Sequence, residues 1–588
     1  AGVSAHTRSA PAPGEAPMPA ANAAELLRRN GADPGIRDRP AVKFGDRVWT
    51  HAEYLAESCR WAQLMFDRKP ADRPLHVGVL LDNTPDYLFA LGGAALSGSA
   101  VVGLNHTRRD EHLLRDVVHT HVSLVVTEPR HLGLLGPIAA ELPVAPDSLL
   151  VSTRFADPDE RAPALGTSLD DALAAVRAGD PGFEPDPDAI WGLIFTSGTS
   201  AAPKAVICSQ RRLMVTGNRM GMIMGLGPDD CGYVCMPLFH SSALMVGWAP
   251  SIVYGASVGL GRKFSASRWL DEVRSYHATW FNYTGKPLAY LLATPEQPDD
   301  ADNSLRVAFG NEGSPEVVDA FARRFGVEVI DAYGATEGGV AVNRDAEERA
   351  GALGQAGDNV QVVDNDGKAR PRARFDADGR LVNADECVGE IVNTAGVGPF
   401  EGYYNNPEAN EQTTRFGWYW TGDLGYLDDD RYLHFAGRNA DWIRVDGENF
   451  SAQPIEAVLG HHPDVVLAAA YGVPDAQAGD QAMAGLVLRD GAVFDPAGFA
   501  RWVDAQHELG PKWRPRYLRI LRAPPTTGTH KIVKRTLVHQ KWRADRVDGD
   551  EIFVRLRGDD SYRPFTADDE RALYDSFVQS QRERFWDL

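Results

Sequence analysis

Short apolar runs alternate with amphipathic helical stretches over about the first 150 residues, and this alternation constrains the fold more than any other feature. Residues 77–81 and 124–127 are apolar runs of strand length, and residues 54–68 have helical spacing. Chains that alternate in this way form parallel sheets covered by helices. We therefore expect an α/β fold whose ligands bind beyond the carboxyl ends of the strands.

The pattern changes twice further along the chain. Between residues 360 and 405, short alternating strands are separated by turn signals such as Asn-Asp-Gly, which predicts a small antiparallel unit. From residue 447 another α/β pattern begins, with strands expected at 465–473 and 482–488. A chain of 588 residues is long enough for several such units.

The composition limits the binding partners and the cellular compartment that we expect. A net charge of −21 argues against nucleic acid or an anionic membrane held by general electrostatics. The five cysteines form no CxxC pair, so we expect neither disulfides nor structural zinc, and a reducing, cytoplasmic location. Glycine and serine interrupt the apolar stretches 87–104 and 242–260, which favours buried helices over membrane spans. Residues 1–22 are rich in Ala and Pro and lack the basic and apolar regions of a signal peptide, so we expect a flexible tail.

A hydroxyl-rich loop follows the apolar run 191–195. Its polar and flexible members are Thr196, Ser197, Gly198, Thr199, Ser200 and, behind a proline, Lys204. Hydroxyl and backbone N–H donors around a glycine, with an ammonium group nearby, suit a polyphosphate. A P-loop is disfavoured because Pro203 and Ala205 flank the lysine where a P-loop has glycine and Ser/Thr. Taken alone, the segment is equally compatible with a Ser/Thr-rich surface turn.

Polar residues also follow two later apolar runs, at the position where open α/β sheets bind ligands. The first run leads into Gly310, Asn311, Glu312 and Gly313, and the second into Tyr333, Gly334, Thr336 and Glu337. Glu337 has the carboxylate that a phosphate-bridging Mg²⁺ needs, and Tyr333 has a ring that can stack on a base.

Four further residues could contribute to a nucleotide or substrate site, but each is weak evidence when taken alone. Asp423 can accept two hydrogen bonds from a ribose diol, and Arg438 follows it by fifteen residues. His240 comes just after a strand that breaks at Pro237, and Lys531 lies in a glycine-bearing loop. A lone histidine is usually structural and a loop lysine is usually solvated, so neither identifies a site by itself.

Five of these segments, taken in order, resemble the adenylate-forming superfamily of acyl-CoA synthetases, aryl ligases, luciferases and peptide-synthetase adenylation domains. The resemblance runs from about Ala41 to the end of the sequence. Residues 105–109, 283–288, 310–313 and 562–566 are similar to the fatty-acid-transport-protein branch and related actinobacterial acyl-CoA synthetases.

The resemblance implies a two-domain enzyme that uses ATP, Mg²⁺ and CoA. We expect a large N-terminal domain at 23–437, made of layered α/β subdomains and a small β-barrel-like unit, and a small mobile α+β C-terminal domain at 438–588. In the family, a carboxylate and ATP give acyl-AMP and pyrophosphate, the C-terminal domain rotates, and a thiol takes the acyl group.

The resemblance also implies residue roles. Thr196–Ser200 and Lys204 hold the β- and γ-phosphates, Thr336 contacts the α-phosphate and Glu337 binds Mg²⁺. The adenine pocket is formed by Gly310, Asn311, Glu312, Gly313, Tyr333 and Gly334, and the ribose is held by Asp423 and Arg438. Lys531 approaches the α-phosphate and the attacking carboxylate. The acyl pocket is shaped by His240, Tyr283 and Lys286, and Ala440 stands at the hinge where relatives have Asp or Lys.

Three functions remain open from the sequence. The first is an acyl-CoA synthetase for a hydrophobic carboxylic acid, and the second is a ligase or diazotase that adenylates nitrite or another acid and passes it to an aryl amine. The third is a binding protein on an inactive enzyme scaffold, which is disfavoured because the residues expected to contact the nucleotide are all present. The identity of the acid and of its acceptor, and the choice between monomer and homodimer, are not predicted.

Overall fold

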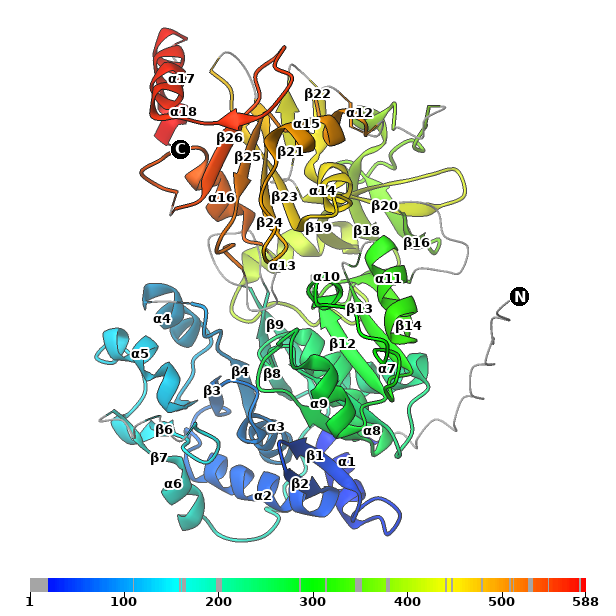
Figure 1. The fold of residues 1–588 in the computed structure, drawn as a ribbon. Helices are drawn as coiled ribbons and strands as arrows, with labels where there is room; N and C mark the ends of the chain where they lie inside the picture. The colour runs from blue at the N-terminus through cyan, green and yellow to red at the C-terminus, as the bar shows by residue number, and fades with distance from the viewer. Residues whose placement is uncertain are drawn as a thin grey trace.

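The computed structural model describes residues 20–587 except 109, 158–159, 161–164, 197–203, 285–286, 312, 314, 344–351, 377–380, 439–441, 446–447, 477–479, 507–508, 511, 527–531, 548 and 581–582. Figure 1 shows a lower body formed by the first half of the chain and an upper body that ends with α17 and α18. The α/β prediction, with a larger N-terminal and a smaller C-terminal part, is confirmed.

The first sheet has seven strands in the order β7-β6-β5-β3-β4-β8-β9, all parallel except the edge strand β9. Its strands are β3 (His76–Leu80), β4 (Ala100–Gly103), β5 (Leu124–Thr127), β6 (Leu149–Val151), β7 (Thr167–Ser168), β8 (Ile190–Phe195) and β9 (Ala205–Ser209). The apolar runs predicted as strands correspond to β3 and β5, and the stretch 54–68 with helical spacing covers most of α2 (His51–Asp67).

Helix α3 (Pro85–Ser97) is buried at every position. It packs on α2 so closely that a Cβ on Gly93 would lie 2.5 Å from Trp61 Cβ. The apolar stretch that begins at residue 87 is therefore a core helix, as predicted, and it continues into strand β4. None of the helices in the described ranges combines the length and the apolarity that crossing a bilayer requires.

The second sheet has eight strands in the order β15-β14-β13-β12-β10-β11-β1-β2, and its pairings are parallel except at the two edges. Its strands are β1 (Pro40–Phe44), β2 (Arg47–Thr50), β10 (Cys231–Val234), β11 (Ser257–Leu260), β12 (Trp280–Thr284), β13 (Val307–Asn311), β14 (Glu328–Gly334) and β15 (Ala341–Asn343). Both residue groups predicted to follow strands, at 310–313 and 333–337, lie at or beyond the carboxyl ends of β13 and β14.

A third, antiparallel sheet has the order β16-β20-β19-β18-β17. Its strands are β16 (Ala352–Gln355), β17 (Val360–Val363), β18 (Gly389–Asn393), β19 (Tyr419–Leu427) and β20 (Tyr432–Arg438). This sheet is the small antiparallel unit that the turn signals predict.

The last part of the chain contains the hairpin β21 (Trp442–Val445) and β22 (Glu448–Ser451) and a mixed sheet of β23 to β27. The mixed sheet consists of β23 (Val465–Pro474), β24 (Asp480–Leu488), β25 (Tyr517–Ile520), β26 (Glu551–Val554) and β27 (Arg563–Pro564). Its helices are α14 (Ala452–Gly460), α15 (Pro496–Asp504), α16 (Lys534–Gln540), α17 (Ala567–Gln579) and α18 (Arg584–Asp587). The strands expected at 465–473 and 482–488 are β23 and β24.

Helix α18 is tied to the end of α16. The buried Lys541 donates from Nζ to the carbonyl oxygens of Phe585, at 2.8 Å, and Trp586, at 3.2 Å. The Trp586 ring packs on Trp542 and Phe577, with centroids 6.2 and 5.7 Å away. All five cysteines are buried and free in the structure.

Candidate active site

The expected phosphate loop joins the antiparallel strands β8 and β9. Thr196 N donates to Lys204 O at 3.0 Å, directly beyond the last strand pair, Phe195 and Ala205. A P-loop leads from a strand into a helix, so this topology supports the conclusion drawn from the spacing. Ser197, Gly198, Thr199 and Ser200 lie outside the described residues.

One tyrosine connects the loop lysine with the expected magnesium ligand. Lys204 Nζ lies 5.0 Å from the centre of the Tyr403 ring, and the Tyr403 hydroxyl donates to Glu337 Oε1 at 2.8 Å. The segment with Tyr403 reaches this position by pairing with β9, since Ile207 N donates to Gly402 O and Tyr404 N donates to Ala205 O. The ammonium group and the carboxylate therefore share one phenol, although Glu337 and Tyr403 are 66 residues apart. The sequence analysis did not identify Tyr403.

Thr336 is held from two sides. Its hydroxyl lies 2.8 Å from Ser241 Oγ, and its carbonyl oxygen accepts a hydrogen bond from the Arg212 guanidinium group. Arg212 also donates to Ile207 O at 2.8 Å, which fixes the guanidinium between β9 and the Thr336 segment. The segment expected to contact the α-phosphate is thus attached both to the phosphate-loop hairpin and to the residue after His240.

The Gly310–Gly313 segment rests on Tyr283. A Cβ on Gly310 would lie 2.5 Å from Tyr283 O, so only glycine fits there. Asp331 Oδ2 accepts from the Tyr283 hydroxyl at 2.7 Å and from Gly313 N at 2.9 Å. Tyr283, expected in the acyl pocket, is fully buried beneath this segment and its hydroxyl binds Asp331. Glu312 lies outside the described residues.

The two predicted ribose ligands are opposite one another in the third sheet. Asp423 in β19 pairs with Arg438 in β20. Asp423 is 5% exposed, and its carboxylate accepts from the Tyr333 hydroxyl at 2.8 Å, so the residue expected at the base and the residue expected at the ribose are in contact. Tyr333 and Gly334 are the last two residues of β14.

His240 lies near the end of the segment between β10 and the π-helical turn η4 (Ser242–Trp248). Its backbone N donates to Pro237 O at 3.0 Å, and its ring lies 4.5 Å from that of Phe239. An apolar cavity behind Phe239 is lined mainly by Tyr87, Leu91, Val101, Trp191 and Leu244.

Three predicted residues, Lys286, Ala440 and Lys531, lie outside the described ranges. The segment with Lys531 is bounded by a bridge between Thr526 and Ile532, and α16 begins at Lys534. Lys534 is paired with Glu456 at 2.8 Å.

Comparison with known proteins identifies the family. Residues 29–404 match the AMP-binding enzyme family, and residues 454–531 match the AMP-binding enzyme C-terminal domain. The chain belongs to the AMP-binding enzyme family. This AMP-binding enzyme is an AMP-forming ligase of the acyl-CoA synthetase type.

Two curated relatives of this AMP-binding enzyme match over most of their length. A steroid-22-oyl-CoA synthetase from Rhodococcus jostii is 44% identical over 551 residues, 93% of this chain and 96% of the relative. A medium/long-chain-fatty-acid–CoA ligase, FadD17, from Mycobacterium tuberculosis is 44% identical over 504 residues, 85% of this chain and 93% of the relative.

Solved structures show the same fold at lower identity. The anthranilate CoA ligase AuaEII in complex with anthranoyl-AMP superposes with a TM-score of 0.71 at 22% identity, covering 88% of this chain and 96% of that one. ATP-bound MatB from Rhodopseudomonas palustris gives a TM-score of 0.71 at 23% identity, covering 90% and 100%.

Proposed function

We propose that this enzyme activates a hydrophobic carboxylic acid with ATP and Mg²⁺ and transfers the acyl group to CoA. The observation that carries the proposal is the phenol of Tyr403, which brings the Lys204 ammonium and the Glu337 carboxylate together. A cation for the phosphates and a carboxylate for the metal that bridges them are the two charges that MgATP requires at one place.

The residues present fit magnesium. Glu337 offers a hard carboxylate oxygen, is 8% exposed, and is oriented by Tyr403. When bound, the ion would withdraw charge from the phosphate oxygens.

In the first half-reaction, a carboxylate oxygen of the acid bonds to the α-phosphorus while the bond to the β-phosphate oxygen breaks, giving acyl-AMP and pyrophosphate. Both reactants are anionic, so cationic groups must reduce their repulsion in the transition state. We assign this role to Lys531, the β- and γ-phosphates to the Thr196–Ser200 loop with Lys204, and the α-phosphate to Thr336. Tyr333 and the Gly310–Gly313 segment would hold the base, and Asp423 and Arg438 the ribose.

In the second half-reaction, the CoA sulfur attacks the acyl carbon and AMP leaves. We place the domain boundary between residues 437 and 438, with Ala440 as the hinge. The end of the third sheet supports a boundary close to this point, because its strand β20 ends at Arg438, one residue beyond the proposed boundary. Free, buried cysteines fit a reducing cytoplasmic compartment.

Apolar side chains beside His240 support a hydrophobic acid. Phe239 precedes His240, Leu244 lies in η4, and both line a small apolar cavity of about 10 Å³ together with Trp191. The two curated relatives are named for a steroid acid and for medium- and long-chain fatty acids, which supports the same class. We assign His240, Tyr283 and Lys286 to the acyl pocket.

The test is a pyrophosphate-release screen on the full chain. One arm offers steroid, aliphatic and aromatic carboxylic acids with ATP, Mg²⁺ and CoA, and the other offers nitrite with aryl amines. We expect AMP and a CoA thioester of matching mass in the first arm, and loss of both products in Lys531→Ala. Product only in the nitrite arm would favour the diazotase instead, and AMP in neither arm would overturn the proposal.

A further inference from the structure

Asn83 joins the two parallel sheets immediately behind the His240 segment. Its side chain is 3% exposed. Nδ2 donates to Met236 O at 2.9 Å and to Gly261 O at 3.2 Å, and Oδ1 accepts from Leu238 N at 2.9 Å. One amide that follows β3 therefore binds the segments that leave β10 and β11 and fixes their position relative to the first sheet.

The Met236–Leu238 segment leads into the site within three residues. His240 N is bonded to Pro237 O, and Ser241 Oγ lies 2.8 Å from the hydroxyl of Thr336, the residue assigned to the α-phosphate. A shift of the backbone at Leu238 would therefore move His240 and Ser241 together.

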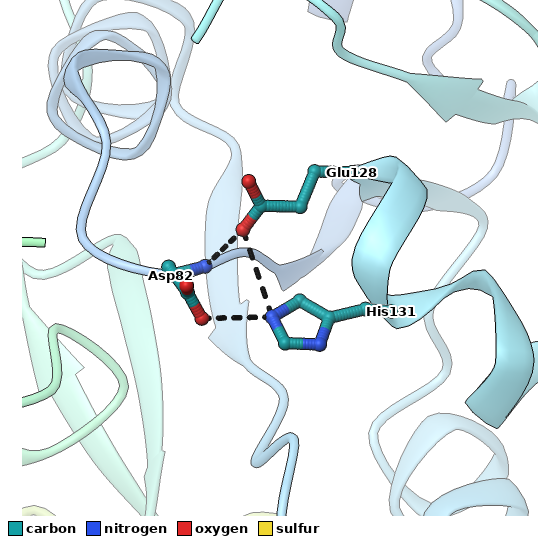
Figure 2. Close-up of side chains that lie close together, drawn as sticks. All are labelled: Asp82, Glu128 and His131. Atoms are coloured by element: carbon teal, nitrogen blue, oxygen red, sulfur yellow. Dashed lines mark hydrogen bonds and ion pairs between the residues drawn. The ribbon is translucent and has the colours of Figure 1, made fainter. Parts of the chain in front are cut away.

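A charged cluster holds the backbone just before Asn83. Figure 2 shows Glu128 Oε1 accepting from Asp82 N at 2.6 Å, and His131 Nε2 lying 2.9 Å from Asp82 Oδ1 and 3.6 Å from Glu128. The side chains of Asp82 and Glu128 are 10% and 2% exposed. The cluster thus fixes the turn that delivers the Asn83 amide.

Two carboxylates and an imidazole with ligand atoms within 4.8 Å of one another would also suit a divalent cation. Two arginines oppose this reading. Arg130 binds Asp82 Oδ2 at 2.7 Å and Arg262 binds Glu128 Oε2 at 3.1 Å, so a cation would have to enter a site that two guanidinium groups already neutralise. Arg262 also follows Gly261, whose carbonyl Asn83 binds, so this ion pair strengthens the same junction.

We propose that Asn83, held by the Asp82–Glu128–His131 cluster, is a positioning residue for acid activation: it keeps the 236–241 segment where His240 and Ser241 face the carboxylic acid. The proposal rests on the proposed function. Asn83 acts through backbone groups and touches neither the acid nor the nucleotide.

Kinetics of Asn83→Ala test the proposal against a matched control. Asn303, at the amino end of β13 and away from the site, makes the same three kinds of bond: Nδ2 donates to Asp300 O at 2.9 Å and Phe325 O at 3.0 Å, and Leu305 N donates to Oδ1 at 2.9 Å. We expect Asn83→Ala to lower kcat/KM for the acid about 10- to 100-fold, mostly through KM for the acid, because small displacements of positioning groups have effects of this size. Asn303→Ala should lower the melting temperature and leave kcat/KM unchanged. Equal kcat/KM in both variants would overturn the proposal.

Asn83→Asp supplies a second readout. The ionised carboxylate can accept from Leu238 N but cannot donate to the two carbonyl groups, whereas the protonated form can donate to one of them. The introduced carboxyl group would be buried between carbonyl oxygens and near the carboxylates of Asp82 and Glu128, which should raise its pKa. The cationic or ionisable groups that would lower this pKa are Arg262, Arg130, His131 and His106. We therefore expect the activity of this variant relative to wild type to rise as the pH falls, and a constant ratio would contradict the proposal.

Two measurements keep the inference separate from the proposed function. If wild type released no pyrophosphate with any acid, the proposed function would fail. Hydrogen exchange would still test whether Asn83 fixes the 236–241 segment. Asn83→Ala should lose protection at residues 236–244, and unchanged protection there would overturn the inference. Elemental analysis should find no stoichiometric transition metal in wild type. About one such ion per chain, lost in His131→Gln, would establish the cluster as a metal site instead.

Discussion

Replacing Tyr403 by phenylalanine separates the two contacts of that residue. The ring 5.0 Å from Lys204 Nζ remains, and the hydroxyl that donates to Glu337 at 2.8 Å is lost. A hydrogen bond to a charged group contributes about 1.5–3 kcal/mol, and about 1.4 kcal/mol corresponds to a tenfold change in rate. Since Glu337 is 8% exposed, solvent replaces the lost donor poorly. We expect kcat/KM for MgATP to fall about 10- to 100-fold.

The assay is pyrophosphate release at a saturating concentration of the best acid, with free Mg²⁺ varied. A Glu337 carboxylate without its donor should bind Mg²⁺ in more than one orientation, so the Mg²⁺ concentration for half-maximal rate should rise. Tyr404→Phe is the control, because the neighbouring hydroxyl lies 2.9 Å from the exposed His121 ring. Unchanged rate and Mg²⁺ dependence in Tyr403→Phe would refute the coupling of Lys204 and Glu337 through this phenol.

Three further predictions address the proposed catalytic lysine, a buried histidine and the α18 contact. Lys531→Ala should lower the adenylation rate by about 10²–10³, because one charge-assisted transition-state contact is lost, with an unchanged circular dichroism spectrum; near-normal pyrophosphate release would contradict its assignment. Burial lowers the pKa of His51 to about 4, so between pH 6.5 and about 4 the unfolded chain binds a proton that the folded chain does not. The free energy of unfolding should therefore decrease as the pH is lowered from 6.5 to about 4, by at most about 1.4 kcal/mol per pH unit, and denaturant titrations of His51→Gln should show a smaller slope. Trp586→Ala should lower the unfolding free energy of the C-terminal part by about 3–5 kcal/mol, since the ring is 8% exposed against Trp542 and Phe577. Calorimetry measures the unfolding free energy of this variant against that of the control Phe416→Ala, in which the replaced residue is 63% exposed and a small loss is expected.

The sequence predicts the parts of the site that depend on short-range patterns. Glycines after β runs identified the ends of β13 and β14, and the interval between Asp423 and Arg438 matches two antiparallel strands that place these residues opposite one another. The apolar character of α3 also followed directly from its residues, because a helix buried on all sides has no polar face.

The sequence did not predict contacts between distant segments. Tyr403 reaches Glu337 only because its segment pairs with β9, and Asn83 reaches Leu238 across 155 residues. Neither residue belongs to a local pattern that distinguishes it from an ordinary buried polar side chain. Tyr283 illustrates the same limit, since its sequence neighbourhood does not reveal that its hydroxyl is bound to Asp331 beneath Gly310.

The hydrogen bonds from Lys541 to the carbonyl groups of Phe585 and Trp586 fix the end of α16 relative to α18. Helix α17 joins these two helices through Phe577, and its outer surface includes Val578, which is 46% exposed. A dye attached there would be carried rigidly with the residues that follow Lys531. Energy transfer from this dye to a second label on the N-terminal part would then test the proposed domain rotation, since a change in distance between the two half-reactions is what that proposal requires.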